Sequence, residues 1–343
     1  MTECLSGGVP RAIESIVRAS GTHEHHVLWP AANTTDSTAN FASIADLPDS
    51  QLDRFKAVRD AVRIMSPDVV HAHSSFAGAY SRLRKLPVPV IYQPHGYKFE
   101  DDSSPRIARA VFRMAERALA KRASAIVVLS PREDELTQAL SSKVPRYFVP
   151  NAPSVTPEGG QEPLAANLHE VAMIGRLSNQ KDPGFFAEVV KLVVAHGAAT
   201  RFTWIGGGTD DQVSEMESQG IRVTGWLTEG ELLIELQRPW IYLHSARYEG
   251  FPLSVLDAAA FGHPIVVRRI AAFVGTDLLQ ADDPQEAASL VLEILSGGTA
   301  RQVAISGGTR LLDEMNLRKQ REALDSLYGK YANQTRAIRE NCQ

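Results

Sequence analysis

The stretch from residue 240 to 267, WIYLHSARYEGFPLSVLDAAAFGHPIVV, constrains the fold more than any other part of the chain. An apolar run of β-forming residues comes first, then a loop with glycine and proline breakers, then a helical pattern ended by glycine, then a second apolar run. The segments are a strand at 240–243, a loop at 245–252, a helix at 253–261 and a strand at 264–267. This order predicts a parallel α/β unit.

Two carboxylates in this stretch lie where such a unit binds its ligand. Glu249 is in the loop, and Asp257 follows about one turn into the helix. In a parallel α/β unit the loop after a strand faces the ligand crevice, and the N–H groups of the following helix favour an anion such as phosphate. We therefore expect one carboxylate to meet ligand hydroxyls while the other reaches across the phosphate site.

The motif that carries these carboxylates resembles the E-x7-E signature of the retaining GT-B glycosyltransferases of family 4, the group 1 glycosyl transferases. The residues that match it are Glu249, Gly250, Phe251, Pro252, Leu253 and Asp257. The family's second Glu is Asp here. The resemblance implies an α/β protein of GT-B fold, with two doubly wound parallel-sheet, Rossmann-like domains facing across a cleft.

Composition agrees with two ordinary globular domains. The chain has 343 residues, 44% hydrophobic and 22% charged, which suggests two domains that each bury a core. The net charge of −4 argues against a general nucleic-acid binder. The two cysteines, Cys4 and Cys342, lie at opposite ends and form no disulfide framework or C-x-x-C site. No apolar run is long enough to span a membrane, so we expect a cytoplasmic protein.

The N-terminal stretch MTECLSGGVPRAIESIV begins almost directly with a glycine turn at Gly7 and Gly8 and a helical pattern at 10–17. Two glycines permit close approach of the backbone to a ligand. In the resembled family this loop follows the first strand, near the donor phosphates, which makes Gly8 a candidate donor-binding residue. That first strand is either missing, as from a start codon assigned too late, or reduced to residues 2–5.

Strand and helix patterns alternate through both halves, which predicts parallel sheets covered on both faces. In the N-terminal half we expect strands at 26–29, 68–72, 88–93, 125–129 and 146–149, and helices at 52–65, 105–122 and 131–140 with a helical stretch ending at 86. In the C-terminal half, besides the opening stretch, we expect strands at 171–174, 201–205 and 221–223, and helices at 183–196, 211–218, 229–236, 284–295 and 318–334.

The composition changes between residues 150 and 167 to Pro, Gly, Ser, Glu and Asn without periodicity, which predicts a linker. The expected organisation is an acceptor-side domain at 1–152, a linker at 153–167, a nucleotide-sugar donor domain at 168–317, and a helix at 318–343 that packs back on the N-terminal domain.

Two cations follow the strand expected at 171–174. Arg176 comes two residues after it and Lys181 five residues later, just before a helix. Arg can bind a diphosphate through two hydrogen bonds, and Lys acts as a point charge. Taken alone, the pair is more often solvated surface. The segment also resembles the family's G-R-L-x-x-x-K motif, which implies that Arg176 and Lys181 hold the donor's pyrophosphate.

His95 directly follows the strand expected at 88–93, in QPHGY. It matches the family's H-G step, which implies that the imidazole contacts the transferred sugar from the other domain and that domain closure completes the site. His71 and His73 also lie near a strand end. We interpret both as structural, because two histidines without a third ligand do not form a zinc site.

The glycine run at Gly206, Gly207 and Gly208 does not fit a dinucleotide fingerprint, because Asp211 occupies the last glycine position. We expect a tight turn after a strand, and the resemblance implies that Gly206 borders the nucleotide. Trp226 lies in a stretch that resembles the family's step near the base, where it could equally pack in the core.

The helix expected at 105–122 is strongly amphipathic. Its apolar residues are Ile107, Val111, Met114 and Ala118, and its basic residues are Arg106, Arg109, Arg113, Arg117 and Lys121. A solvated outer face is the simpler interpretation. The alternative is a peripheral contact with the anionic inner face of the plasma membrane, which would suit a lipid-linked acceptor.

These features lead to one main hypothesis: a retaining hexosyltransferase-type enzyme that moves a sugar from a UDP- or GDP-linked donor to a saccharide or lipid-linked hydroxyl in polysaccharide or glycolipid synthesis. Arg176, Lys181 and the helix start at Leu253 and Ser254 would neutralise the leaving diphosphate without a metal ion or other cofactor. The resemblance implies that Glu249 holds hydroxyls of the sugar. It also implies that Asp257 accepts from the ribose.

A second departure from the family pattern and several rival functions remain open. Arg268, Arg269 and Phe273 replace small residues of the family, and they could reshape the sugar pocket or lie on the surface. The rival functions are a sugar-nucleotide epimerase or phosphorylase of the same architecture, a non-catalytic nucleotide-sugar-binding protein, and, least favoured, a nicotinamide dehydrogenase.

Overall fold

The computed structural model describes residues 1–4, 7–30, 40–157 and 168–340. These residues form two compact units. Unit 1 comprises Met1–Ala152 and Asn316–Gln343, and unit 2 comprises Pro153–Met315. The expected domain boundary after residue 152 coincides with this division, and the chain returns to unit 1 at residue 316. Most of the expected linker, 158–167, lies outside the described residues.

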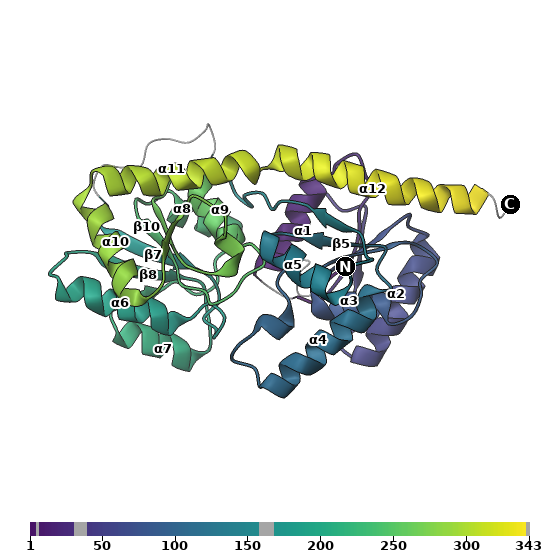
Figure 1. The fold of residues 1–343 in the computed structure, drawn as a ribbon, viewed down its shortest axis with the longest axis horizontal. Helices are drawn as coiled ribbons and strands as arrows, with labels where there is room; N and C mark the ends of the chain where they lie inside the picture. The colour runs from purple at the N-terminus through teal and green to yellow at the C-terminus, as the bar shows by residue number, and fades with distance from the viewer. Residues whose placement is uncertain (5–6, 31–39, 158–167, 341–343) are drawn as a thin grey trace. The chain divides into compact units, whose positions relative to one another are not determined.

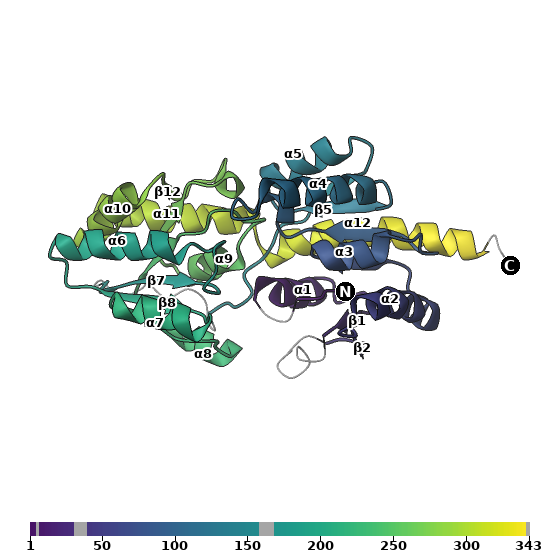
Figure 2. The same ribbon diagram turned by 90° about the horizontal axis from the view of Figure 1, so that it is seen from below.

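Unit 1 is an α/β assembly whose strands are all parallel (Figures 1 and 2). Its strands are β1 (His26–Trp29), β2 (Ser43–Asp46), β3 (Val70–His73), β4 (Val90–Gln93), β5 (Ala125–Val128) and β6 (Arg146–Phe148). Its helices are α1 (Gly8–Ala19), α2 (Gln51–Met65), α3 (Ser75–Arg82), the 3-10 turn η2 (Lys98–Glu100), α4 (Arg106–Ala120), α5 (Pro131–Leu140) and α12 (Leu317–Glu340).

The strands of unit 1 form two separate sheets. One has the order β3-β4-β5-β6, and the other is the pair β1-β2. The two central strands of the larger sheet, β4 and β5, are fully buried, as expected for strands covered on both faces. α12 packs against α1, and its side chains Leu324, Leu327 and Tyr331 join the core of this unit. The C-terminal helix is therefore part of unit 1.

Unit 2 is a doubly wound parallel sheet. Its strands are β7 (Glu170–Ile174), β8 (Arg201–Ile205), β9 (Ile221–Val223), β10 (Ile241–His244), β11 (Ile265–Arg268) and β12 (Leu279–Ala281). Its helices are α6 (Pro183–Ala195), α7 (Asp210–Ser218), α8 (Glu229–Leu236), α9 (Leu253–Ala260), η3 (Ala271–Phe273), α10 (Pro284–Ser296) and α11 (Thr299–Glu314).

The strand order of this sheet is β12-β11-β10-β7-β8-β9, with all named pairs parallel. The order reverses direction between β7 and β10, so the loops that follow these two central strands diverge at that edge. Ligands bind outside the carboxyl ends of the strands at such a reversal. Figure 1 shows α6 and α7 on one side of these strands and α8 and α9 on the other.

The α/β class and the alternation of elements are confirmed, and most expected elements agree within two residues. The helix α11 was not predicted. Its sequence carries Gly307 and Gly308, which normally weaken a helix. Here a Cβ at Gly307 would lie 2.5 Å from the carbonyl oxygen of Asp277, and Gly308 lies against Ala259 of α9. Close packing on α9 therefore selects glycine inside this helix.

The short strands β2 and β12 were also not predicted, and α12 is longer than the helix expected at 318–334. No strand forms at the described residues 1–4, and Leu5 of the expected short strand lies outside the described residues. Within the described ranges, no helix has the length and apolar character needed to cross a membrane.

Candidate functional site

Three loops of unit 2 leave the carboxyl ends of adjacent strands. They follow β7, β8 and β10, which are neighbours in the sheet. These loops carry Lys181, Gly206 and Glu249, so the parallel sheet brings predicted site residues from distant parts of the sequence to one edge.

Lys181 and Glu249 form a direct ion pair. The Nζ of Lys181 lies 2.5 Å from Oε1 of Glu249, and the two side chains are only 17% and 10% exposed. Gln180 reinforces the contact between the loops, since its side-chain amide donates to the carbonyl of Tyr248 at 3.1 Å and to Oε2 of Glu249 at 3.4 Å. The loop after β7 thus holds the loop after β10 through charge and hydrogen bonds.

The carboxylate of Glu249 stays ionised although it is largely buried. Burial alone would raise its pKa, but the charge of Lys181, together with the neighbouring His244 and the Lys181 hydrogen bond, outweighs burial and lowers the pKa to about 2. An ionised carboxylate at this position can accept hydrogen bonds from ligand hydroxyls.

His244, at the end of β10, lies behind Glu249. Its Nε2 is 3.6 Å from Oε1 of Glu249, and its Nδ1 is 3.0 Å from the hydroxyl of Tyr242. The Tyr242 hydroxyl is also 2.8 Å from the Oγ of Ser254 in α9. All three side chains are buried. Hydrogen bonds therefore link His244 through Tyr242 to the first turn of α9, while Nε2 of His244 faces the carboxylate of Glu249 without a hydrogen bond to it.

Arg176 lies on the same loop as Lys181 but does not join this cluster. Its side chain is exposed and, in the part of the chain that the structure describes, has no hydrogen-bond or ion-pair partner. The structure therefore brings Lys181 and Glu249 together and leaves the guanidinium of Arg176 available to a ligand.

Glycines allow the loops after β7 and β8 to pack backbone against backbone. A Cβ at Gly206 would lie 2.2 Å from the carbonyl oxygen of Gly175, so no other residue fits there without movement. The stem of Lys181 crosses Gly175, with its Cε 3.0 Å from the position of a Cβ. Trp226 covers Gly207 and is 55% exposed, so its indole packs on the glycine turn and not in the core.

The N-terminus of α9 has the features of an anion site. Pro252 precedes the helix, and no side chain among the described residues caps it. The first backbone N–H groups, those of Leu253 and Ser254, therefore have no intrahelical acceptor and can donate to a ligand. Gly250, Phe251, Pro252, Leu253 and Ser254 are all buried or nearly so. Packing thus fixes the position of this helix start.

Asp257 is fully buried in α9 and bonds to the start of the linker. One of its oxygens accepts from the Ser154 amide at 2.6 Å, and both oxygens lie within 3.0 Å of the Ser154 hydroxyl. The Val155 amide contacts it at 3.3 Å. The carboxylate thus faces residues of its own chain, and its assignment to the ribose stays a prediction.

The residues that depart from the family pattern near β11 have structural partners. Arg268 pairs with Asp182 at 2.7 Å and lies over the ring of Phe185, and Arg269 pairs with Asp282 on the surface. Phe273 is fully buried. These contacts support the surface and packing interpretation for the two arginines.

In unit 1, His95 lies in a strained turn after β4. It has a φ of 56° although it is not glycine, and it is followed by Gly96 with a φ of 93°. Left-handed residues other than glycine are uncommon and cluster at functional sites. Burial lowers the pKa of His95 to about 3, so its imidazole is neutral.

Two side chains hold this turn. His73 Nδ1 lies 3.0 Å from His95 Nε2, and the carboxylate of Glu133 accepts from the amides of Gly96 at 2.6 Å and Leu129 at 2.8 Å. Burial raises the pKa of Glu133 to about 7. His71 stacks on His73 and bonds to Tyr328, so both histidines have partners within the protein.

Gly8 is the first residue of α1, and Gly7 before it has a φ of 92°. A Cβ at either position would meet nothing within 4 Å among the described residues. Within the described chain the turn thus has room beside it, and the contact of Gly8 with a donor stays a prediction.

The helix α4 exposes its apolar face. Ile107, Val111 and Met114 are 80%, 53% and 64% exposed, while the helix packs inward through Phe112, Glu116 and Ala120. Arg106, Arg113, Arg117 and Lys121 are exposed beside this apolar stripe. Arg109 instead turns inward and donates to the carbonyl of Phe99 at 3.0 Å. The outer face is thus both apolar and basic.

Sequence reasoning missed His244 and Glu133. His244 could have been found from its place at the carboxyl end of β10, five residues before Glu249. Glu133 stands three residues after Ser130, a capping-box spacing that explains its place at the start of α5. Nothing in that spacing indicates its bond to Gly96.

Within the described residues, no group of three or more His, Cys, Asp or Glu is arranged to hold a metal ion.

Family models match both units. The model described as "Glycosyl transferase 4-like domain" matches residues 7–152, and that described as "Glycosyl transferases group 1" matches residues 169–297. Together they span most of the described chain.

Curated relatives and solved structures point the same way. An uncharacterized 41.2 kDa protein in the cps region of Klebsiella pneumoniae is 26% identical over 79% of this chain and 80% of its own length. The UDP-Gal:alpha-D-GlcNAc-diphosphoundecaprenol alpha-1,3-galactosyltransferase of Escherichia coli is 23% identical over 59% of this chain and 58% of its own length. The sucrose-phosphate synthase of Thermosynechococcus elongatus superposes with a TM-score of 0.79 at 15% identity, covering 96% of this chain and 94% of its own, which confirms the GT-B fold.

Proposed function

The chain belongs to the group 1, family 4-like glycosyltransferases, and from this premise we propose that it transfers a hexose from a UDP-sugar, with retention of configuration, to a hydroxyl of a lipid-linked saccharide. Its enzyme class, a glycosyltransferase that uses nucleotide sugars, follows from the family. The donor, the acceptor, the stereochemistry and the residue roles are the proposal.

The observation that carries the proposal is the paired Lys181 and Glu249 at the carboxyl edge of unit 2. A sugar diphosphate presents anionic phosphates next to neutral hydroxyls, and this pair offers a cation and an acceptor side by side. We assign Lys181 to the pyrophosphate and Glu249 to hydroxyls of the transferred sugar. The uncapped start of α9 supplies further N–H donors for the phosphates.

The reaction requires stabilisation of the negative charge that develops on the leaving diphosphate as the glycosidic bond breaks. Lys181, the exposed Arg176 and the N–H groups of Leu253 and Ser254 can stabilise this charge without rearranging. The leaving phosphate then takes the proton of the acceptor hydroxyl on the same face, so no nucleophile from the protein is required. This assignment involves no metal ion.

His95 is assigned to the transferred sugar. Its neutral imidazole can donate one hydrogen bond, and the contacts from His73 and the Glu133-anchored turn fix the ring in place. A strained turn held from two sides supports a precise contact and not a general surface role. Gly8, which has open space above its Cα, is assigned to the donor phosphates.

A lipid-linked acceptor would be reached through α4. Its exposed stripe of Ile107, Val111 and Met114, flanked by Arg106, Arg113 and Arg117, has the apolar and basic composition of a helix that lies in an anionic membrane interface. No acidic side chain lies on the exposed face of α4, since Glu116 points inward. The E. coli relative, by its name, acts on a diphosphoundecaprenol-linked sugar, which supports this choice of acceptor class.

Two measurements test the proposal. In a thermal-shift screen, UDP and one UDP-hexose should raise the melting temperature by several degrees, because a ligand that binds only the folded state stabilises it. Turnover of that donor with a lipid-linked saccharide should then give an α-linked product from an α-linked donor, read by NMR. Absence of any shift with UDP and GDP conjugates would contradict nucleotide-sugar binding. Binding without turnover would favour the non-catalytic rival, and a changed sugar without acceptor would indicate an epimerase.

A further inference from the structure

The imidazoles of His73 and His95 come from neighbouring strands of unit 1 and meet beyond the sheet. β3 and β4 pair in parallel, with His73 opposite Gln93. If β4 continued as a strand, residue 95 would lie two positions, roughly 6–7 Å, beyond His73. The left-handed conformation of His95 turns the chain back instead. Nδ1 of His73 and Nε2 of His95 thus lie 3.0 Å apart, within hydrogen-bond distance.

The backbone on both sides of this contact is held in place. Ser74, which follows His73, also has a positive φ, of 81°, and its amide donates to the carbonyl of Gln93 at 2.9 Å. After the second imidazole, the amide of Gly96 donates to Glu133 at 2.6 Å. Left-handed residues other than glycine cost free energy and persist only where their surroundings hold them. Two such residues at one contact indicate that the fold specifies the position of both rings.

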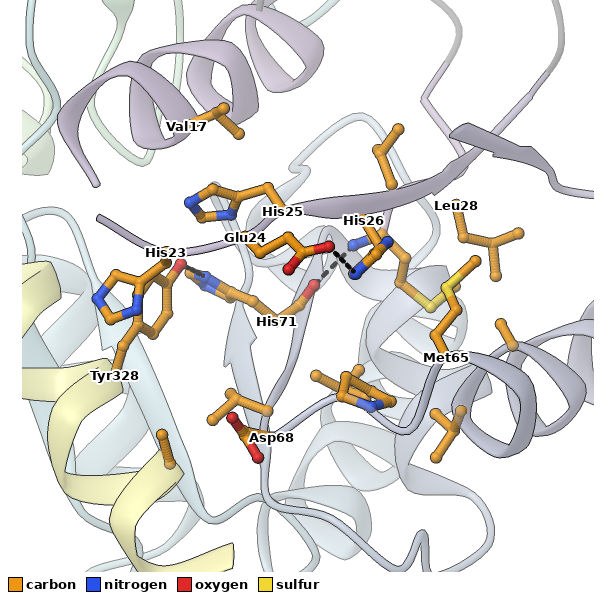
Figure 3. Close-up of a pocket in the computed structure, with 18 of the residues that line it drawn as sticks. Val17, His23, Glu24, His25, His26, Leu28, Met65, Asp68, His71 and Tyr328 are labelled. Atoms are coloured by element: carbon orange, nitrogen blue, oxygen red, sulfur yellow. Dashed lines mark hydrogen bonds and ion pairs between the residues drawn. The ribbon is translucent and has the colours of Figure 1, made fainter. Parts of the chain in front are cut away.

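A third histidine fixes the plane of the His73 ring. His71 lies two positions earlier on the same face of β3, and the two rings stack with their centroids 4.0 Å apart. Nδ1 of His71 is 2.7 Å from the hydroxyl of Tyr328 in α12. Figure 3 shows His71 and Tyr328 side by side, joined by this hydrogen bond. The ring of His73 therefore has one fixed neighbour on its face and another, His95, at Nδ1.

All three imidazoles are neutral at physiological pH. Burial lowers the pKa of His71 and of His73 well below the ordinary value, and it lowers the pKa of His95 to about 3. A neutral imidazole carries its proton on one ring nitrogen, so one nitrogen donates and the other accepts. In the contact between His73 and His95, one nitrogen must therefore be protonated and the other bare. This contact decides which nitrogen of His95 carries the proton.

The proposed role of His95 fixes the direction of the hydrogen bond. In that role its imidazole donates to a hydroxyl of the transferred sugar. Nδ1 is the ring nitrogen of His95 that has no partner in the described part of the chain, so the donated proton belongs there and Nε2 is bare. The proton in the contact between the two rings then comes from Nδ1 of His73.

We propose that His73 is a positioning residue for the transfer reaction: it donates from Nδ1 to Nε2 of His95 and so holds that imidazole in the tautomer whose Nδ1–H is free for the sugar. The reaction role rests on the proposed function, whereas the tautomer is a property of the protein without ligand. Without this donor, the ring of His95 divides between two tautomers, and only one of them donates from Nδ1. The apparent affinity for the sugar then falls with the fraction of competent molecules.

The first test reads the tautomer in the ligand-free protein. ¹⁵N NMR of protein labelled at the histidine ring nitrogens separates protonated from bare nitrogens, and the variant His95→Gln assigns the His95 signals. We expect a protonated Nδ1 and a bare Nε2 at His95 of the wild-type protein. His73→Asn keeps an N–H group near the place of Nδ1 and should preserve this tautomer. His73→Leu removes the donor and should bring a proton onto Nε2 of His95.

The second test measures turnover of a UDP-hexose. We expect kcat/KM to fall roughly 10-fold or more in His73→Leu and to stay within about threefold of the wild-type value in His73→Asn, because only the first loses the donor to His95. The inhibition constant of UDP should not change, since UDP lacks the sugar. His25→Leu is the matched control: it removes a half-buried histidine of unit 1 that bonds to Ser20, and it should change neither the tautomer nor kcat/KM.

Two results would overturn the proposal: a proton on Nε2 of His95 in the wild-type protein, or a tautomer in His73→Leu that equals that of the wild type. The wild-type spectrum decides even if His73→Leu does not fold. A changed tautomer with unchanged kcat/KM would refute the role of His73 in the reaction. If the wild-type protein turns over no nucleotide sugar, the proposed function fails, and the NMR result still decides whether His73 sets the tautomer.

Discussion

The ammonium of Lys181 and the carboxylate of Glu249 meet at 2.5 Å although 68 positions separate them in the chain. A largely buried ion pair contributes little net stability, because desolvation of both charges offsets their attraction. Its value here is that the ammonium of Lys181 lowers the pKa of Glu249 and keeps that carboxylate ionised in a site with little water. A donor that inserts its phosphates beside Lys181 and its hydroxyls beside Glu249 would find both groups already charged and oriented.

Replacing one partner of this pair should cost both activity and stability. Lys181→Ala removes the cation from the leaving diphosphate, and we expect kcat to fall roughly 100- to 1000-fold, the usual cost of one electrostatic contact to a developing charge. It also leaves Glu249 buried without its cation, so the melting temperature should fall. The double variant Lys181→Ala with Glu249→Gln should recover stability without recovering activity, because no charge is then unpaired. A double variant less stable than Lys181→Ala would show that the pair contributes net stability.

His244 should act on the sugar end of the donor and not on the nucleotide end. Its imidazole lies 3.6 Å from Glu249, so His244→Phe loses the contact behind the carboxylate while keeping a ring of similar size. We expect kcat/KM for the UDP-sugar to fall roughly 10- to 100-fold through misplacement of Glu249, with the inhibition constant of UDP unchanged. His263→Phe is the control, because it removes a buried histidine that bonds to Trp240 and Leu236 and does not contact Glu249. A parallel loss of UDP affinity in His244→Phe would indicate a general structural role.

Glu133 predicts a pH dependence of stability with a definite sign. Burial raises its pKa from 4.5 to about 7, so the folded state binds the proton more tightly than the unfolded state does. Its contribution is fully present below pH 4.5 and is lost as the pH rises to about 7, by roughly 3 kcal/mol at 1.4 kcal/mol per unit. Relative to Glu133→Gln, the wild-type protein should therefore lose stability across this range. Denaturant unfolding of both proteins at several pH values measures the difference, and a difference that does not vary with pH would contradict the assignment.

Local patterns were sufficient for most of the fold. Apolar β-branched runs such as that of β5 predicted buried strands, and the helix expected at 131–140 matches α5. The missed helix α11 shows the limit, because Gly307 is selected by the carbonyl of Asp277, which lies 30 positions away and cannot be seen in a local window.

In the candidate site too, some residues could be predicted from the sequence and others depend on packing between distant segments. Lys181 and Glu249 could be found because both follow strands of a parallel sheet and therefore meet at its carboxyl edge. Contacts that depend on the direction in which a side chain points could not be predicted from the sequence. The contact of Asp257 with Ser154 and the inward turn of Arg109 in α4 follow from packing alone, and helical periodicity did not reveal that the apolar face of α4 is exposed.

Asp257→Asn should separate a structural role from a nucleotide-binding role. The change removes a charge that accepts hydrogen bonds from the amide and the hydroxyl of Ser154, and hydrogen bonds to a charged group contribute about 1.5–3 kcal/mol each. We expect a lower melting temperature, and a smaller loss in Ser154→Ala, which keeps the backbone contact. An unchanged donor KM in folded Asp257→Asn would exclude the ribose role, and a KM raised tenfold or more with normal stability would support it.

The exposed face of α4 should bind anionic membranes through both its charges and its apolar stripe. The variant Arg106→Glu, Arg113→Glu, Arg117→Glu tests the charges and leaves Arg109 in its contact with Phe99. Its control, Arg84→Glu, Lys85→Glu, Lys143→Glu, makes the same change in net charge at exposed residues of unit 1 outside α4. In co-sedimentation with vesicles of phosphatidylglycerol and phosphatidylcholine, the α4 variant should lose binding and the control should keep most of it, because each basic residue near an anionic surface contributes about 1 kcal/mol.

Ile107→Ser with Met114→Ser should weaken the binding that persists at high salt, where charges are screened and only apolar insertion remains. If the α4 variant and its control lose vesicle binding equally, the binding depends on the net charge of the protein alone, and α4 is not the specific contact.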